Sequence, residues 1–466
     1  MSTILIKNAT VLTMDSSRRI IEDGAVFING NRVEAVGKTD EIAKNYKAEK
    51  VFNGHGKAVL PGLVNTHNHL WCVLTKGMGT DLSLVNWLNS CLHLMAPNLR
   101  ENDFYLSGLL ANIEAIKSGC TTNADFAYFH LKTQPNGAKK IIQSFQDTGV
   151  RCVYGRGMCD TGAEAGVTPD IIENTKDSLN QAENLIREYN GTSDGMIRIW
   201  VAPAAIFINT TELLVGCREL ANKYKTGIMM HIAETADFDA YARQVYNMGE
   251  LDYYNSIDLL GPDVLGAHCV WIDDRGIRMF RDKDVKVSHN PTSNMFLHDG
   301  IAPIPRFIEA GVTVGMATDG AGSNGNLDMI SALKHVALLH KVHIDAAAIT
   351  AEKVLEMATI DGSKCLGMQD EVGSIEKGKK ADLIIMNLKN PHIAPVSSLS
   401  QSLVYSATSE CVETSIINGK VIMENRRITT VDEEKVVDDI IKITDELVVK
   451  SNMLHFKERP WKTIVR

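Results

Sequence analysis

One short stretch, residues 59–69, constrains this chain more than any other. An apolar run from Val59 to Val64 is interrupted only by a Pro-Gly pair and leads to two histidines one residue apart, His67 and His69. Such a run predicts a buried strand. Side chains alternate along a strand, so the two imidazoles project to the same side and can bind one metal ion. A single His-x-His is as typical of two ordinary histidines, so the choice depends on the rest of the chain.

The stretch at 59–67 is the first of eight apolar, strand-like runs that alternate with helix-like segments. The others are 121–126, 150–157, 197–202, 227–231, 264–268, 285–289 and 312–319. Helical spacing of apolar residues is clearest at 171–189 and 212–224. This alternation predicts an α/β fold, a (β/α)8 barrel of the TIM type. A doubly wound open sheet is the alternative, but no G-x-G-x-x-G motif opens a strand–helix unit.

The segments that flank the predicted barrel consist of short strands and turns. Asn29-Gly30 and Asn418-Gly419 each lie between two strand-like runs, as in β-hairpins. We expect residues 1–57 and 371–432 to pair into one small, discontinuous β-sandwich domain. The barrel would then occupy 58–370, and a C-terminal helix (433–451) and tail would complete residues 433–466.

Composition narrows the classes of partner. The 466 residues are 44% hydrophobic and 23% charged, which is typical of a soluble globular protein. A net charge of −9 argues against nucleic acid or an anionic membrane as a partner. We find no apolar run long enough to span a bilayer and no signal-peptide pattern at the N-terminus. The nine cysteines form no C-x-x-C pair, which predicts free thiols in a reducing cytoplasm.

Four of the predicted strands carry candidate metal-site residues at their carboxyl ends. His67 and His69 lie at the end of the first strand, His231 at the fifth, His268 at the sixth and Asp319 at the eighth. In such a barrel the carboxyl ends of the strands meet at the face that carries the active site. Imidazole and carboxylate together suit zinc or iron(II). The convergence therefore predicts a metal centre.

Glu234 follows His231 by three residues, on the loop that leaves the fifth strand. A carboxylate there can move protons between a water molecule and a leaving group. Stabilisation of a helix N-terminus is the alternative role. Beside the histidine cluster, we favour catalysis.

Longer motifs around these residues are similar to those of a known enzyme family. They are Pro-Gly-Leu-Val-Asn-Thr-His-Asn-His (61–69), His-Ile-Ala-Glu (231–234), Ala-His-Cys (267–269), Ser-His-Asn-Pro-Thr-Ser-Asn (288–294), Ala-Thr-Asp-Gly-Ala-Gly-Ser-Asn (317–324) and the tail motif at 373–382. Together they resemble the amidohydrolase superfamily, specifically its mononuclear deaminase and chlorohydrolase branch. That branch includes methylthioadenosine/S-adenosylhomocysteine deaminases, guanine deaminases and atrazine chlorohydrolase.

The resemblance implies that His67, His69, His231 and Asp319 bind one divalent metal. Zinc is the expected ion and Fe2+ is the alternative. Related binuclear barrels carry a bridging lysine at the end of the fourth strand, where this chain has Val-Ala-Pro (201–203). One metal ion is therefore expected rather than two.

The resemblance also implies three catalytic residues. His268 would polarise the attacking water or the leaving-group region, and Asp319 would accept a proton from that water. Glu234 would protonate a ring nitrogen and help an amine to leave.

Departures from the family pattern bear on the substrate. Nucleoside deaminases of this branch place a glutamate for the ribose where this chain has Leu-Met-Ala-Pro (94–97). The loop after the seventh strand reads Phe-Leu-His-Asp-Gly (296–300) in place of the usual Lys-Leu-Ala-Ser-Gly. Both changes favour a free base or a heterocycle with apolar substituents. Gly320 replaces the amide side chain of atrazine chlorohydrolase, which argues against a specialised triazine dechlorinase.

Polar and aromatic residues on the predicted loops around the mouth are candidate substrate contacts, with packing as the alternative role for the aromatic ones. They are Trp71, Trp87, His93, Asn123, Asp125, Phe207 and Ser323.

The sequence thus predicts a metal-dependent deaminase that hydrolyses an aminated N-heterocycle of the purine, pterin or triazine type. The alternatives are a methylthioadenosine, S-adenosylhomocysteine or adenosine-type nucleoside deaminase, a triazine chlorohydrolase, and a catalytically silent scaffold. The complete set of ligands argues against the scaffold. The expected partner is a small heterocyclic molecule, and members of the branch are commonly homo-oligomers of two or more chains.

Overall fold

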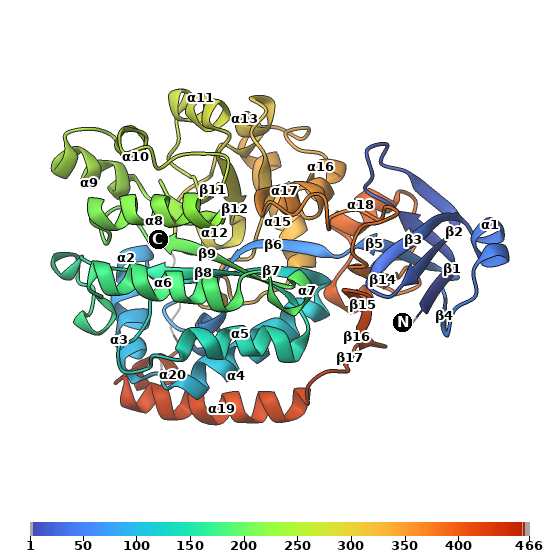
Figure 1. Cartoon of the computed structure of the whole chain (residues 1–466), viewed down its shortest axis with the longest axis horizontal. Helices are drawn as coiled ribbons and strands as arrows, with labels where there is room; N and C mark the ends of the chain where they lie inside the picture. Colours follow the sequence, from blue (N-terminus) through green and yellow to red (C-terminus); the bar gives the residue numbers. More distant parts are fainter. Residues whose placement is uncertain (1–2, 459, 462–466) are drawn as a thin grey trace.

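Eight parallel strands form the larger body of the structure, a computed structural model that describes residues 3–458 and 460–461 (Figure 1). In sheet order they are β6 (Leu63–Asn68), β7 (Cys120–Ala127), β8 (Arg151–Met158), β9 (Ile197–Pro203), β10 (Ile228–Ile232), β11 (Val264–His268), β12 (Lys286–His289) and β13 (Val314–Met316). Hydrogen bonds just beyond β13 join it to β6. Asn65 Nδ2 donates to Thr318 Oγ1 at 2.8 Å, and the Asp319 N–H donates to the His67 carbonyl at 3.1 Å. The predicted (β/α)8 barrel is confirmed.

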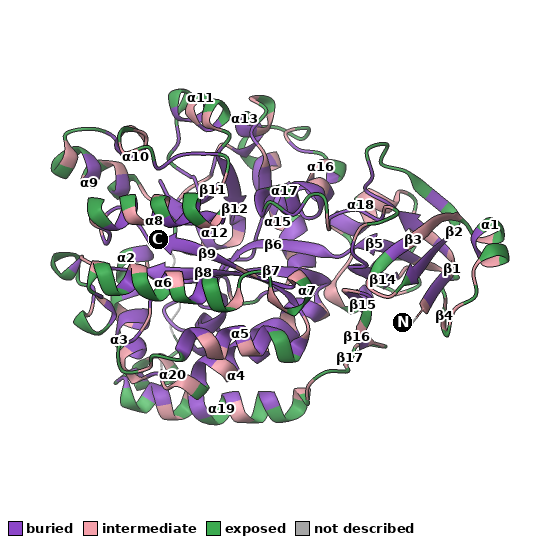
Figure 2. Cartoon of the chain, in the orientation of Figure 1, coloured by how far each residue is buried: buried purple, intermediate pink, exposed green. Residues whose placement is uncertain are grey.

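Helices surround these strands and expose only their outer faces, as Figure 2 shows for α6. The main ones are α4 (Glu101–Lys117), α5 (Gly137–Thr148), α6 (Thr175–Tyr189), α8 (Thr211–Tyr224), α9 (Ala236–Tyr246), α10 (Glu250–Ser256), α11 (Asp274–Lys283), α12 (Pro291–Phe296), α13 (Ile304–Glu309), α15 (Met329–His343), α16 (Ala351–Met357) and α17 (Ile360–Cys365). Short turns near the mouth are η1 (Leu70–Thr75), α2 (Leu84–Trp87), η2 (Leu88–Leu92), α3 (His93–Met95), η3 (Ala96–Asn98) and α14 (Ala321–Asn324). Residues Asn174 and Thr210 cap α6 and α8 with side-chain oxygens, as their residue types favour.

The first predicted strand is in fact two strands that belong to different sheets. β5 (Lys57–Pro61) pairs with β14 (Leu383–Asn387) in the terminal sheet, and β6 begins after Gly62 in the barrel. A Cβ atom at Gly62 would lie 2.0 Å from Thr121 Oγ1, so only glycine lets the chain pass this close to β7. The apolar run looks continuous in sequence because both strands are buried.

The terminal segments form one mixed sheet of nine strands. Its order is β17-β16-β15-β14-β5-β1-β2-β3, and β4 pairs with β1. The remaining bounds are β1 (Thr3–Leu12), β2 (Ile20–Asn29), β3 (Arg32–Lys38), β4 (Lys50–Asn53), β15 (Val412–Ile417), β16 (Lys420–Glu424) and β17 (Arg427–Ile428). The predicted association of the two ends of the chain is confirmed. This sheet has its own apolar core, which includes Ile6, Val26 and Leu383.

A buried ion pair connects the terminal sheet to the barrel. Arg151 on β8 donates from Nε and Nη2 to the two carboxylate oxygens of Asp382, at 2.8 and 3.0 Å, and both side chains are almost fully buried. The Asp382 carbonyl also accepts the Gly62 N–H at 2.9 Å. The contact therefore lies at the point where the chain crosses from one sheet to the other.

The predicted C-terminal helix is present as α19 (Glu433–Lys450), which packs against α4. The remaining short elements are α1 (Thr39–Asn45), η4 (Ala163–Ala165), η5 (Pro169–Ile171), α7 (Thr192–Gly195), α18 (Leu399–Tyr405), η6 (Ser409–Cys411) and α20 (Leu454–Lys457). Of the segments interpreted above, residues 1–2 and, in the tail, 459 and 462–466 lie outside the described residues. Within the described part of the chain, every helix is too short or too polar to cross a bilayer.

Candidate metal centre and substrate cavity

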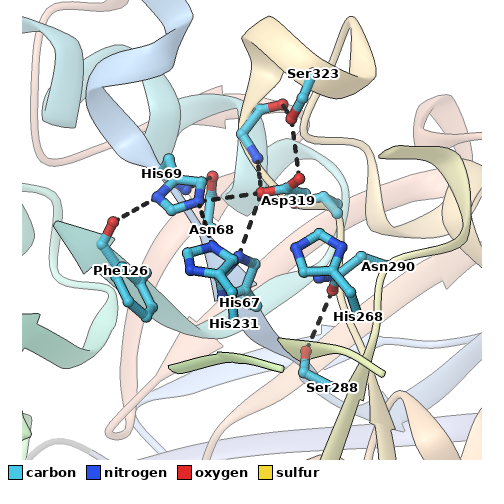
Figure 3. Close-up of polar contacts among 12 residues, drawn as sticks. His67, Asn68, His69, Phe126, His231, His268, Ser288, Asn290, Asp319 and Ser323 are labelled. Atoms are coloured by element: carbon cyan, nitrogen blue, oxygen red, sulfur yellow. Dashed lines mark hydrogen bonds and ion pairs between the residues drawn. The ribbon is translucent and has the colours of Figure 1, made fainter. Parts of the chain in front are cut away.

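Four buried side chains from three strand ends converge at the mouth of the barrel (Figure 3). Asp319 Oδ1 lies 3.4 Å from His67 Nε2 and 3.5 Å from His69 Nε2. His231 Nε2, from β10, lies 3.4 Å from His69 Nε2. The ring nitrogens and the carboxylate oxygen therefore surround one small volume.

Backbone carbonyls orient two of these imidazoles. His69 Nδ1 lies 2.6 Å from the Phe126 carbonyl, and His231 Nδ1 lies 2.7 Å from the Ala204 carbonyl. Because a carbonyl only accepts, each Nδ1 carries the proton and each Nε2 keeps a free lone pair. His67 Nε2 is buried and makes no hydrogen bond within the described structure. These atoms fit a divalent metal ion.

Asp319 is held in an unusual backbone conformation. Its φ of +61° lies in the left-handed region, which a non-glycine residue adopts at a cost of about 1–3 kcal/mol. The Gly320 N–H donates to its Oδ1 at 2.7 Å, and the Ser323 hydroxyl donates to its Oδ2 at 2.9 Å. The two donors hold the carboxylate toward the histidines and offset part of this cost.

The protonation states of the cluster suit metal binding. Burial lowers the pKa of His67 to about 4 and lowers that of His231 well below its ordinary value. Burial alone would raise the pKa of Asp319, but the close contact with His67 and the neighbouring imidazoles of His69 and His268 hold that pKa well below its usual range. Neutral imidazoles and an ionised carboxylate are the forms that coordinate a metal.

Glu234 and His268 lie beside the cluster and can move protons. Glu234 Oε1 is 3.6 Å from His268 Nε2, and His268 Nδ1 is 2.8 Å from Asn294 Oδ1. Burial raises the pKa of Glu234 well above its ordinary value, and the carboxyl groups of Asp299, Asp319 and Glu250 raise it further. A protonated carboxyl at this position can act as a general acid.

A small, mainly apolar cavity lies over this cluster, as is typical of a small-molecule site. Its lining residues are His69, Leu84, Trp87, Leu88, Leu92, Tyr128, Ala205, Phe207, His231, Glu234, Phe238, His268, Leu297, Asp319 and Ser323. Three of the seven candidate substrate contacts, Trp87, Phe207 and Ser323, are among them.

The other four candidates lie outside this lining. Trp71 packs against Phe129 with ring centroids 5.0 Å apart, and Asp125 accepts the Leu70 N–H at 2.9 Å. On β7, Asn123 donates to Asn112 at 3.3 Å and accepts from Asn68 at 3.4 Å. His93 Nδ1 lies 3.0 Å from Asn89 Oδ1. Asn123 and Asp125 connect neighbouring segments through these hydrogen bonds, whereas Trp71 Nε1 and His93 Nε2 are buried without a hydrogen-bond partner in the described structure.

The sequence analysis missed several lining residues and one further carboxyl. Leu84, Leu88 and Leu92 recur at a spacing of four residues, so helical periodicity could have identified their common face. Tyr128 directly follows β7, where residues of a barrel face the mouth. Asp299 was noted only as a departure from a family pattern, although it lies beside Glu234 and His268.

Residues 58–422 match the model of the amidohydrolase family, which is more than half of the chain. The chain belongs to the amidohydrolase family. This confirms the resemblance that the sequence motifs carry.

The chain is similar along nearly its whole length to several named proteins. It is 39% identical over 448 residues to the 5'-deoxyadenosine deaminase of Methanobrevibacter smithii, covering 96% of this chain and 98% of the relative. It superposes on an adenosine deaminase from Xanthomonas campestris with bound zinc, with a TM-score of 0.89, 26% identity, and coverage of 96% and 98%. The atrazine chlorohydrolase of Arthrobacter aurescens TC1 complexed with zinc gives a TM-score of 0.88, 25% identity, and coverage of 95% and 100%.

Proposed function

We propose that this protein is a metal-dependent hydrolase that removes the amino group of a nitrogen heterocycle and releases ammonia. The observation that carries the proposal is the convergence of His67, His69, His231 and Asp319 beside the buried acid Glu234, at the base of an apolar cavity. The relative from M. smithii, named as a deaminase, supports this choice of reaction.

One divalent ion would be held by the three histidines and Asp319. When bound, it supplies a water molecule whose pKa is lowered to about 7, and thus a nucleophile at neutral pH. Zinc is the ion we propose, with Fe2+ as the alternative, because the two solved relatives contain zinc and the donors are imidazole and carboxylate.

The protein's own groups direct the protons. Because His268 Nδ1 faces the acceptor Asn294 Oδ1, its Nε2 has a lone pair for the attacking water, and Asp319 accepts a proton from that water. The oxygen adds to the ring carbon that bears the amino group. Glu234 protonates the adjacent ring nitrogen, a proton then passes to the amino group, and the carbon–nitrogen bond breaks to release ammonia. The water's oxygen remains on carbon as a carbonyl.

The cavity favours a free base or an apolar-substituted heterocycle as the substrate. Trp87, Phe207 and Phe238 offer flat apolar surfaces to a ring. The segment 94–97, where nucleoside deaminases of this branch carry a ribose-binding glutamate, has no carboxylate, and Ala96 is fully buried. A nucleoside without a 5'-hydroxyl is the second candidate, supported by the name of the M. smithii relative.

The test is ammonia release by the zinc-analysed enzyme. The substrates would be purine bases, adenosine, 5'-deoxyadenosine, methylthioadenosine, S-adenosylhomocysteine, aminopterins, and amino- and chlorotriazines, each run beside Glu234→Gln. Ammonia from one class, lost in the variant, would support the proposal and identify the substrate class. Chloride release without ammonia would indicate the chlorohydrolase alternative, and a metal-loaded enzyme inactive on every compound would contradict the proposed reaction.

We also infer a cytoplasmic homo-oligomer of two or more chains. All nine cysteines are free and buried, which suits a reducing compartment. Light scattering coupled to gel filtration would measure the number of chains.

A further inference from the structure

Asp299 is a buried carboxyl group for which the proposed reaction has no role so far. It lies on the loop between α12 and α13 and is 3% exposed. Its N–H donates to the Asn294 carbonyl at 2.9 Å, and its own carbonyl accepts the Trp271 Nε1–H at 2.8 Å. Both carboxylate oxygens are buried and have no hydrogen-bond partner within the described structure. The pinned backbone therefore holds an unsatisfied acid inside the protein, which calls for a functional explanation.

The side chain of Asp299 faces the proposed acid of the reaction. One oxygen from Asp299, one oxygen from Glu234 and one ring nitrogen of His268 all lie within 4.8 Å of one another. The other carboxyl groups that act on Glu234 are Asp319, after β13, and Glu250, on α10. Asp319 also acts on Asp299. Among the described residues, the charged groups that act on the two carboxyls are other acids, and the buried His268 lies beside them. Two buried carboxyls this close do not both ionise readily.

We propose that Asp299 is a positioning residue that shares one proton with Glu234 and so keeps Glu234 protonated for its role as the acid. This inference rests on the proposed deamination. In that cycle the proton leaves Glu234 for the substrate nitrogen, and a proton from the attacking water returns to the pair. The pair is therefore unchanged after each turnover. Water supplies the oxygen of the carbonyl and the two added hydrogens, one on the ring nitrogen and one in ammonia. Burial and the Asp319 carboxylate raise the pKa of Asp299 above its ordinary value, in agreement with a proton that the pair retains.

The first test is the pH profile of ammonia release by Asp299→Asn, an isosteric change that removes the second acid. Without it, Glu234 ionises at lower pH, so the alkaline limb of kcat should move down by about one pH unit, and activity at pH 8 relative to pH 6 should fall about tenfold. Asp282→Asn, on the exposed face of α11, removes an equal charge and should leave the profile unchanged. Zinc content is measured in each variant. An unshifted profile, or a uniform loss at every pH, would overturn the role of Asp299.

A second readout does not depend on the substrate. In the folded wild-type protein the pair keeps its shared proton to a higher pH than the same carboxyls do in the unfolded chain, because burial and the Asp319 carboxylate raise the pKa of Asp299. Folding therefore grows less favourable as pH rises above about 3.8. Asp299→Asn lacks this penalty. Its melting temperature should equal or exceed that of the wild type, with a difference that widens from pH 5 to pH 8. A constant difference, or a lower melting temperature at every pH, would overturn proton sharing. An enzyme that shows this widening but releases no ammonia would contradict only the proposed function.

Discussion

Replacement of Ser323 by alanine separates a metal-site role from a substrate-contact role. The Ser323 hydroxyl lies 2.9 Å from Asp319 Oδ2 and 3.1 Å from the Gly320 carbonyl. A hydrogen bond to a charged group contributes about 1.5–3 kcal/mol, which corresponds to about 10- to 150-fold in an equilibrium constant. Replacing a residue that orients a metal ligand typically lowers metal affinity or activity by about 10- to 100-fold. We therefore expect Ser323→Ala to weaken zinc binding by about one to two orders of magnitude.

Competition with a chromogenic chelator would measure the zinc dissociation constant, and steady-state kinetics at saturating zinc would give kcat and KM. The matched control is Ser451→Ala, because that serine is also buried and hydrogen-bonded, to Asn98 at 3.1 Å, but lies at the end of α19. The control should retain wild-type zinc affinity. Unchanged zinc affinity in Ser323→Ala together with a raised KM would refute this reasoning and would favour the substrate contact predicted from the sequence.

Three further changes test other parts of the structure. Glu234→Gln should lower kcat by about 100- to 10,000-fold with unchanged zinc content, since it removes the acid; normal turnover would exclude that role. Arg151→Met leaves Asp382 buried and unpaired, and should lower the free energy of unfolding in urea by about 3–5 kcal/mol. The double variant Arg151→Met/Asp382→Leu should recover most of this loss. Additive losses would argue against coupling of the pair. The metal-free enzyme should lose stability as pH falls from 6.5 through 4, because unfolded His67 gains its proton first; the same slope in His67→Gln would contradict this.

The arrangement of the barrel was predictable because its signals are local. Strand-like runs recur between helical segments, and each short, buried strand is recognisable from its own apolar residues. The histidines and Asp319 were predictable for a related reason, since the carboxyl ends of parallel strands meet at one face whatever the details of packing. The change of sheet at Gly62 was not predictable, because β5 and β6 are both apolar and only their partner strands distinguish them.

The sequence by itself determined the fold class and predicted the candidate metal ligands and Glu234, because strand periodicity and ligand chemistry are properties of nearby residues. Tertiary structure alone decided which side chains face the cavity. Asp125 and Trp71 have residue types suited to a substrate site, yet a backbone N–H and the Phe129 ring engage them. Asp299 is a residue type common in loops, yet packing places its carboxylate beside Glu234, where no group in the described structure donates a hydrogen bond to it. Such contacts join residues distant in the chain, and their energies depend on the partners that folding brings together.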